Sequence, residues 1–387
     1  MSSPIQIRRS VALAILAGTL GLGAAANACA PPAILTFEAP GAGSTPGSQQ
    51  GTVGAGINDF GVIAGSTRDE NSVRHGYLRS PDGKYVLFDH PNAGTSGATN
   101  QGTRVGGLNA LGAVAGSVRD ANNFDSPFVR DPEGNFFTLS FPNFGGGDGD
   151  AINFWGAMVG TYLLLSDPNG PNFLHFHGFI RSPNGTITQF DPPGSTNTEI
   201  PTTSINVAGA VTGDYWVCSA DLSSCTVHGF IRTASGKYTS FDVPGAGPDG
   251  YSGEGTYPQG INDLGEVSGI WVDVNFIYHG FVRNPDGRIT TFDVPTICTK
   301  LSSPPADCAY NGTYAAGVNL LGRVVGTYYG EDGNPHGFWR DADGSITRFD
   351  APGSGYFTQP VAINDSGQIT GLVYDPNIVV HGLLVKP

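Results

Sequence analysis

Short runs of alternating apolar and polar residues, separated by glycine-rich turns, recur along the whole chain. The sixth copy is representative, with runs at Thr313–Asn319, Arg323–Tyr329, His336–Arg340 and Ser345–Asp350. Each run is short and rich in Val, Ile, Thr, Tyr and Phe, which is the composition of β-strands. The pattern therefore predicts a module of four antiparallel strands.

A Phe-Asp-x-Pro sequence at the end of each predicted fourth strand gives the length of the repeat. Its copies and variants lie at Phe37–Pro40, Phe88–Pro91, Leu139–Pro142, Phe190–Pro193, Phe241–Pro244, Phe292–Pro295 and Phe349–Pro352. The first six follow one another at 51 residues and the last comes after 57. A period of this length, filled with short strands, indicates a radial array of small sheets.

Two kinds of turn recur with the same period. The first is Asn-x-x-Gly, which begins at Asn58, Asn109, Asn153, Asn206, Asn262, Asn319 and Asn364. The second ends in a glycine, at Gly83, Gly134, Gly185, Gly236, Gly287 and Gly344. Asn can bond its own backbone and Gly accepts a positive φ, so both patterns predict tight hairpins rather than catalytic residues.

The phase of the repeat favours a closed array over an open solenoid. The chain enters on a fourth strand at residues 33–40 and leaves on a third strand at His381–Leu384. We therefore expect an all-β, seven-bladed β-propeller over residues 29–387, with four antiparallel strands per blade and the ring closed by the N-terminal strand joining the C-terminal three-stranded blade. The expected blades span about 44–91, 95–142, 145–193, 198–244, 254–295, 311–352 and 357–387, with 33–40 as the outer strand of the last.

The first 28 residues have the features of a signal peptide. Arg8 and Arg9 precede an apolar stretch at 11–26, and Ala26-Asn27-Ala28 fits a cleavage site. No stop-transfer flank follows, so no membrane span is expected. Removal of this segment leaves 387 − 28 = 359 residues, close to seven repeats of 51. The predicted location is secreted, extracellular or periplasmic.

The charge balance excludes one class of partner. Without Arg8 and Arg9 the chain has 19 − 2 = 17 basic and 33 acidic residues, a net charge of −16. Such a surface repels nucleic acid.

Four of the five cysteines are spaced as local disulfides, Cys218–Cys225 and Cys298–Cys308. Cys29 would follow the cleavage site, where bacterial outer-membrane lipoproteins carry their lipid. The Leu that normally precedes a lipidated cysteine by three residues is Ala here. The sequence therefore favours a free or trimmed thiol over a lipid anchor.

The predicted third strands carry a recurring His-Gly-Phe-x-Arg sequence or a variant of it. Its histidines are His75, His177, His228, His279, His336 and His381. We expect each to be structural, lying opposite the Phe of the neighbouring strand, as His177 opposite Phe190, and bonding the backbone of the loop after Phe-Asp-x-Pro. A metal site is the alternative, but blades spread equivalent positions around a circle instead of bringing them together.

These histidine motifs, together with Ile-Asn-x-x-Gly-x-Val-x-Gly, resemble the bacterial extracellular HAF-type repeat, in which Ala stands where this chain has Gly. The resemblance covers all of the chain after residue 28. It implies export and a propeller-like repeat fold, and it implies no catalytic residue.

One face is expected to hold the variable loops, because second-to-third and blade-to-blade connections meet there. Acidic residues end the second strands near this face, at Asp69, Asp120, Asp273 and Asp375. Aromatic residues precede them or their equivalents, at Tyr162, Tyr215, Trp216, Trp271 and Tyr328, and His175 lies outside the repeat frame nearby. The two interpretations are turn caps with packed rings, or a site for Ca²⁺ or a sugar.

Two functions follow from these expectations. The first is a non-catalytic exported propeller that binds an extracellular glycan, cell-wall component or protein, with no cofactor required and Ca²⁺ as an option. The alternative is a secreted carbohydrate-active or lactone-type hydrolase or lyase with its site on the looped face. The chain has no nucleophile motif, which favours the non-catalytic function. Many propellers are enzymes, but the argument from them to this chain is an analogy of fold alone.

Overall fold

The computed structural model describes residues 32–140, 142–164, 175–201, 204–219, 223–250, 253–295, 312–355 and 357–387. Within it, Pro32–Pro387 is one compact unit. The predicted signal peptide 1–28, Cys29 and the Cys298–Cys308 pair lie outside the described residues.

The regular secondary structure of the described residues is almost entirely β-strand, arranged in groups of four strands. The first three groups after β1 (Ala33–Phe37) are β2 (Gly51–Ile57), β3 (Ile63–Arg68), β4 (Arg74–Arg79) and β5 (Tyr85–Phe88); β6 (Gly102–Leu108), β7 (Val114–Arg119), β8 (Asp125–Arg130) and β9 (Phe136–Thr138); and β10 (Phe144–Ile152), β11 (Met158–Leu164), β12 (Phe176–Arg181) and β13 (Ile187–Phe190). The next three are β14 (Asn197–Glu199), β15 (Val211–Cys218), β16 (Cys225–Arg232) and β17 (Tyr238–Phe241); β18 (Gly255–Ile261), β19 (Val267–Val272), β20 (Tyr278–Arg283) and β21 (Ile289–Phe292); and β22 (Thr313–Val318), β23 (Val324–Tyr329), β24 (Pro335–Arg340) and β25 (Ile346–Phe349). The chain ends with β26 (Phe357–Ile363), β27 (Ile369–Tyr374) and β28 (Val380–Lys386).

Consecutive strands of each group pair antiparallel, as the sequence predicts. The N-terminal strand β1 pairs antiparallel with β28, from Ala33 opposite Lys386 to Phe37 opposite Gly382. Single parallel pairs, Gly51 with Val380 and Arg74 with Gly102, link three of the groups into one 12-stranded sheet. The remaining groups are separate four-stranded sheets.

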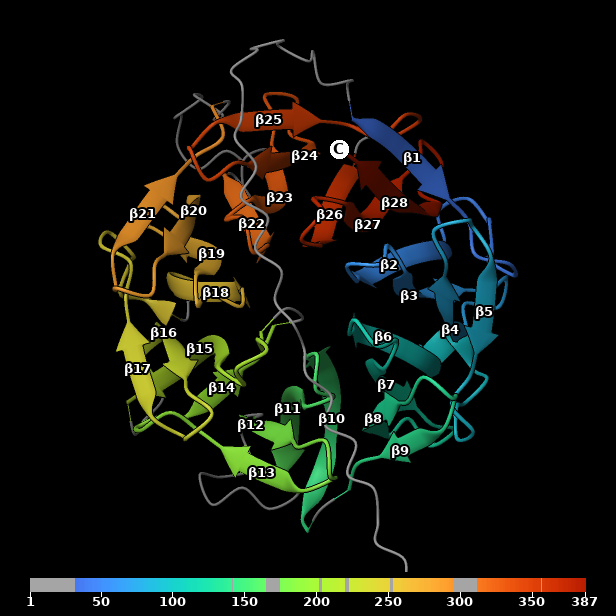
Figure 1. Ribbon diagram of the computed structural model, residues 1–387, viewed down its shortest axis with the longest axis horizontal. Helices are drawn as coiled ribbons and strands as arrows, with labels where there is room; N and C mark the ends of the chain where they lie inside the picture. The colour runs from blue at the N-terminus through green and yellow to red at the C-terminus, as the bar shows by residue number, and fades with distance from the viewer. Residues whose placement is uncertain are drawn as a thin grey trace, which may run out of the picture. The chain divides into compact units, whose positions relative to one another are not determined.

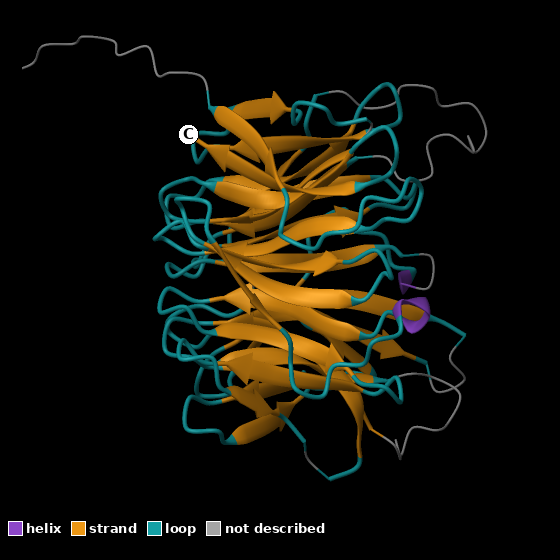
Figure 2. Ribbon diagram, turned by 90° about the vertical axis from the view of Figure 1, so that its right-hand side faces the viewer, coloured by secondary structure: helices purple, strands orange, loops and turns teal. Residues whose placement is uncertain are grey.

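The sheets of Pro32–Pro387 follow one another around a common centre, with the first strand of each innermost and the last outermost (Figure 1). Seen from the side, the strands run between two faces (Figure 2). The short 3-10 helix η1 (Gly97–Thr99), which belongs to the connection between β5 and β6, lies at one of these faces.

The third strand of each group supplies a large side chain that is fully buried in the core. These side chains, all 0% exposed, are Tyr77, Phe128, Phe179, Phe230, Phe281, Phe338 and Leu383. A glycine on the second strand makes room for the ring; at Gly326, for example, an added Cβ would lie 2.9 Å from the Phe338 ring. The repeated Phe of His-Gly-Phe-x-Arg is therefore a core residue, whose burial stabilises the blade.

The Asn-x-x-Gly turns are hairpins, as predicted. In the first, Asn58 Oδ1 accepts hydrogen bonds from the backbone of Phe60 and Val62, and Gly61 has φ of 74°. Each of the seven Asn side chains also donates Nδ2–H to the backbone oxygen of the next such Asn. The series runs Asn58, Asn109, Asn153, Asn206, Asn262, Asn319, Asn364 and back to Asn58.

Candidate ligand-binding site

The recurring histidines bind a carboxylate, not the loop backbone that the sequence suggested. Nδ1 of His75, His177, His228, His279 and His336 lies 2.8–3.0 Å from the carboxylate of Asp89, Asp191, Asp242, Asp293 and Asp350, respectively. His381 makes the same contact with Glu38. The Asp of Phe-Asp-x-Pro is therefore the partner of the His, and both residues serve to join the third and fourth strands.

The expected cross-strand neighbour is wrong by one position. Gly178, not His177, lies opposite Phe190. A Cβ on Gly178 would lie 2.6 Å from the Phe190 ring, so the ring lies over the glycine. This contact explains why the motif has Gly after the His.

The acidic residues at the ends of the second strands cap turns in four separate blades. Oδ1 of Asp69 accepts backbone hydrogen bonds from Asn71 and Val73 at 2.9 and 2.8 Å. Asp120, Asp273 and Asp375 make the equivalent pairs of bonds. Their arrangement is that of turn caps, and within the described residues no group of three or more His, Cys, Asp or Glu side chains is placed to hold a metal ion.

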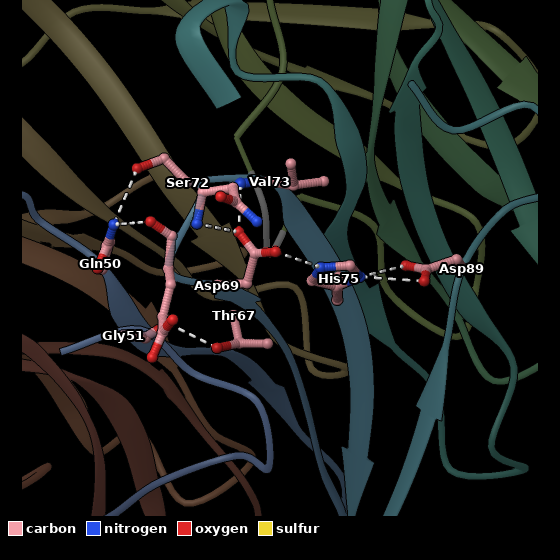
Figure 3. Close-up of polar contacts among 10 residues, drawn as sticks. Gln50, Gly51, Thr67, Asp69, Ser72, Val73, His75 and Asp89 are labelled. Atoms are coloured by element: carbon pink, nitrogen blue, oxygen red, sulfur yellow. Dashed lines mark hydrogen bonds and ion pairs between the residues drawn. The ribbon is translucent and has the colours of Figure 1, made fainter. Parts of the chain in front are cut away.

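In several blades the histidine lies between two carboxylates. Figure 3 shows His75 between Asp89 and Asp69, whose Oδ2 is 3.6 Å from His75 Nε2. The hydrogen bond to Asp89, together with the charge of Asp69, raises the pKa of His75. At His336, burial lowers the pKa, but the bonds to Asp332 and Asp350 outweigh it and the pKa is raised.

The aromatic residues suggested as ligand contacts pack on these histidines. Tyr162, Tyr215 and Tyr328 are 3–7% exposed, with ring centroids 5.2–5.4 Å from the rings of their histidines. The half-buried Trp271 stacks on His279 at 4.1 Å. Burial leaves the three tyrosines little ring surface for a sugar.

Two further predicted residues lie away from these stacks. Trp216 is half-buried on β15, and His175 is buried directly before β12. Cys218 and Cys225 form the predicted disulfide, across the pair β15–β16.

Non-repeating residues meet instead around the first group of strands, which adjoins the second group on one side and β26–β28 on the other. Four arginines gather there: Arg68 at the end of β3, Arg74 at the start of β4, Arg104 in β6 and Arg119 at the end of β7. They line two adjoining cavities of about 290 Å³ each, which share Arg74 and Arg104. We call this region the arginine cleft.

Backbone pairing brings these arginines together. Arg68 lies directly opposite Arg74 in the β3–β4 pair, and Arg74 pairs with Gly102 of the next sheet. Gly102 has φ of 120°, and a Cβ there would lie 2.2 Å from the Arg74 carbonyl oxygen. Only glycine permits the two sheets to approach this closely.

The four guanidinium groups differ in their partners. Arg104 bonds Asp148 at 2.9 Å, and Arg119 forms a two-pronged pair with Asp125 at 2.6 and 2.9 Å. Arg68 and Arg74 have no ion pair or side-chain hydrogen bond with any of the described residues. Like charges directly opposite on paired strands destabilise a sheet, so the first blade keeps an unfavourable pair in the cleft.

Two ionisable groups in or beside the cleft have shifted pKa values. Burial, together with the charges of the other three arginines, lowers the pKa of Arg74 to about 10, so it remains protonated at neutral pH. Asp150 lies 4.0 Å from Arg104, and its burial raises its pKa to about 7. The cleft is therefore cationic, with a compensating carboxylate that titrates near neutrality.

The four arginines differ from the residues at equivalent positions of the other groups, but the equivalence becomes clear only from the strand register. At the position of Arg104 the other groups carry Val53, Asp148, Glu199, Tyr257, Tyr314 and Gln359. At the position shared by Arg68 and Arg119 they carry Leu163, Trp216, Val272, Tyr329 and Tyr374. The arginines are departures from the repeat, and the register shows that the departures are neighbours.

Comparison with known proteins supports the fold class but indicates no activity. No protein-family model matches this chain, and no curated protein matches it. Among solved structures it resembles a streptogramin B lyase, with 16% identity and a TM-score of 0.52 over 91% of this chain and 97% of that one. It also resembles the β-propeller domain of the trilobed protease from Pyrococcus furiosus, with 9% identity and a TM-score of 0.55 over 91% and 95%.

A third similar structure is a puromycin hydrolase S511A mutant, with 12% identity and a TM-score of 0.52 over 85% of this chain and 51% of that one. At such identities the likeness concerns fold alone, and the chain has a β-propeller fold. No helix among the described residues has the length and apolar character needed to cross a membrane.

Proposed function

We propose that this chain is an exported, seven-bladed propeller that acts as a non-catalytic binding module for an extracellular ligand. Closure of the ring is supported by the β1–β28 pairing and by the Asn58–Asn364 bond, which joins residues 306 apart. Export is supported by the disulfide Cys218–Cys225, which suits an oxidising compartment. The His-Gly-Phe motifs support membership of the HAF-type repeats.

One contrast carries the functional proposal. The repeated polar residues have structural partners: the Asn side chains join turns, the His side chains bind Asp or Glu, and the second-strand Asp side chains cap turns. The arginine cleft, by comparison, holds two cations that no described residue pairs, beside cavities large enough for a small ligand. An unpaired charge in a cavity costs stability, and a few charged groups in a cavity are typical of a binding site.

The test is binding of the purified protein to an array of glycans and cell-wall fragments, with and without Ca²⁺. We expect at least one ligand to bind, with no turnover of that ligand on prolonged incubation. Absence of binding to every member would remove the glycan and cell-wall version of the proposal.

One observation favours the alternative, a secreted carbohydrate-active or lactone-type hydrolase or lyase. Glu199 and Asp214 lie directly opposite each other in the β14–β15 pair. Burial raises the pKa of both, and Glu199 further raises that of Asp214. Two neighbouring carboxyl groups, one of which keeps its proton, can act as acid and base. However, Asp214 is 4% exposed, which gives a substrate little access. Release of reducing ends or lactone opening by the wild type, lost in Asp214→Asn, would favour the enzyme.

A further inference from the structure

The arginine cleft has the chemistry of a site for a short acidic ligand. Arg68 and Arg74 face each other across one strand pair, and both line the first of the two cavities. Guanidinium groups form two parallel hydrogen bonds with a carboxylate or a sulfate, which a neutral ligand cannot match. An anion between them would also remove the repulsion of the like-charged pair.

The walls of the same cavity indicate what else the ligand carries. Val53 of β2, Leu372 and Tyr374 of β27, and Val380 of β28 line it beside the arginines. Apolar and aromatic walls with a few charged groups are typical of sites for small organic ligands, and a tyrosine suits the apolar face of a sugar ring. The ligand therefore has an uncharged body as well as an anionic group.

The charge of the whole chain limits the length of the ligand. Its net charge is −14, and the positive charge of the cleft is local. A long polyanion would extend beyond the cleft and meet a repulsive surface, whereas a short ligand interacts with the arginines alone. The cleft selects a short acidic ligand over an acidic polymer.

We propose that the arginine cleft binds a short acidic oligosaccharide, with a carboxylate or sulfate held by Arg68 and Arg74 and the sugar body against Val53, Leu372 and Tyr374. This inference rests on the proposed function, since it names the ligand of that binding module. Arg104 and Arg119 are already paired with Asp148 and Asp125, and they add positive potential without being the primary contacts.

Titration calorimetry with trigalacturonate and its methyl ester tests the proposal. The ester has the same sugars without the negative charges, and inorganic sulfate serves as an anion without a sugar. We expect trigalacturonate to bind at least about 10-fold more tightly than the ester, because the ester cannot form a charge-assisted bond to guanidinium. We also expect it to bind more tightly than sulfate, because sulfate makes no apolar contact.

The matched variants are Arg68→Met and Arg74→Met, with Arg288→Met as a control for the same change in net charge at an exposed turn. We expect each cleft variant to weaken trigalacturonate binding at least about 10-fold and the control to change it less than twofold. Thermal melting of the free variants checks folding, and removal of a like-charge neighbour predicts an unchanged or higher melting temperature for Arg74→Met.

The outcomes separate this proposal from the function on which it rests. Equal affinity for acid and ester, or wild-type affinity in both cleft variants, would overturn the acidic site while leaving a glycan-binding module in place. No binding of the acid, the ester or any other array member would overturn both. Sulfate bound as tightly as trigalacturonate would show that the sugar body contributes nothing and would also overturn the proposed ligand class.

Discussion

Removal of one Asn side chain at the junction of the chain ends tests whether the propeller is a closed ring. Asn364 Nδ2 donates to the Asn58 carbonyl at 2.9 Å and to Gln368 Oε1 at 2.9 Å, and its Oδ1 accepts from Gln368 N at 2.8 Å. Ser366 Oγ donates a fourth bond to Asn364 Oδ1. Asn262 also makes four bonds: its Nδ2 donates to the Asn319 carbonyl at 2.9 Å and to Glu266 Oε2, and its Oδ1 accepts from Leu264 N and Glu266 N. Both side chains are buried, at 3% and 5% exposure, so Asn262→Ala is a matched control.

The expected cost follows from the bonds lost. Each deleted hydrogen bond contributes about 1 kcal/mol net, and a buried carbonyl left without a donor costs a further 1–3 kcal/mol or so. With four bonds lost and one carbonyl left without a donor, Asn364→Ala and Asn262→Ala should each lower the free energy of unfolding by about 5–7 kcal/mol. In a closed ring the bond across the chain ends contributes as much to the free energy of unfolding as a bond between consecutive modules.

Urea denaturation followed by circular dichroism and tryptophan fluorescence measures both variants under the same conditions. We expect the two changes to agree within about 1 kcal/mol, since the contribution of a single hydrogen bond varies by about 0.5 kcal/mol. A cost at Asn364 that is smaller than that at Asn262 by clearly more than this would refute closure, because only the bonds within its own turn would then have been lost.

Four further variants test other parts of the account. The affinity of the wild type for trigalacturonate, measured by calorimetry, should fall several-fold as the pH rises from 6 to 8, because Asp150 beside Arg104 ionises with a pKa of about 7. The Asp150→Asn variant should bind the ligand with equal affinity at the two pH values. Because the pKa of His336 is raised in the folded state, its protonation stabilises the fold below pH 6.5, and this contribution is lost as the pH rises through the pKa of the folded state. In urea titrations, His336→Gln should therefore lower the free energy of unfolding by up to about 1 kcal/mol at pH 5.5 and by less at pH 9. The raised pKa of buried Asp214 makes the folded state lose stability as the pH rises above 3.8, so Asp214→Asn should melt higher than wild type at pH 7 and the difference should vanish near pH 4. Gly178→Ala places a Cβ 2.6 Å from a buried ring and should destabilise the fold by about 1–3 kcal/mol, and an unchanged melting curve would contradict that packing.

Much of the scaffold could be predicted because its signals are local. Asn at the start of a turn and Gly at its end act within four residues, so the hairpins at Asn58–Gly61 and its equivalents follow from sequence. The pairing of β1 with β28 followed from the phase of the repeat. The Cys218–Cys225 disulfide followed from a separation of 7 residues.

The partner of the repeated His could not be predicted with the same reasoning. His177 and Asp191 are 14 residues apart, on different strands, and their contact depends on register. An error of one position put His177 opposite Phe190, where Gly178 lies. Since side chains alternate along a strand, this slip reversed which residue meets the ring and which meets the carboxylate.

The candidate site was missed for a related reason. Arg68, Arg74 and Arg104 each interrupt the repeat at a different position, and nothing local links them. Their proximity arises from the contact between two sheets at Arg74 and Gly102, which depends on the arrangement of blades. The sequence shows which residues depart from the repeat, and the structure shows which of these residues are neighbours.

We propose that the repeated residues build the propeller and that the arginine cleft binds its ligand. A crystal structure of the protein grown with trigalacturonate tests it most directly. We expect a carboxylate within hydrogen-bonding distance of the guanidinium groups of Arg68 and Arg74, with a sugar ring against Tyr374. A ligand bound instead to the repeated His, Asp and Tyr side chains, with the cleft free of it, would contradict the account.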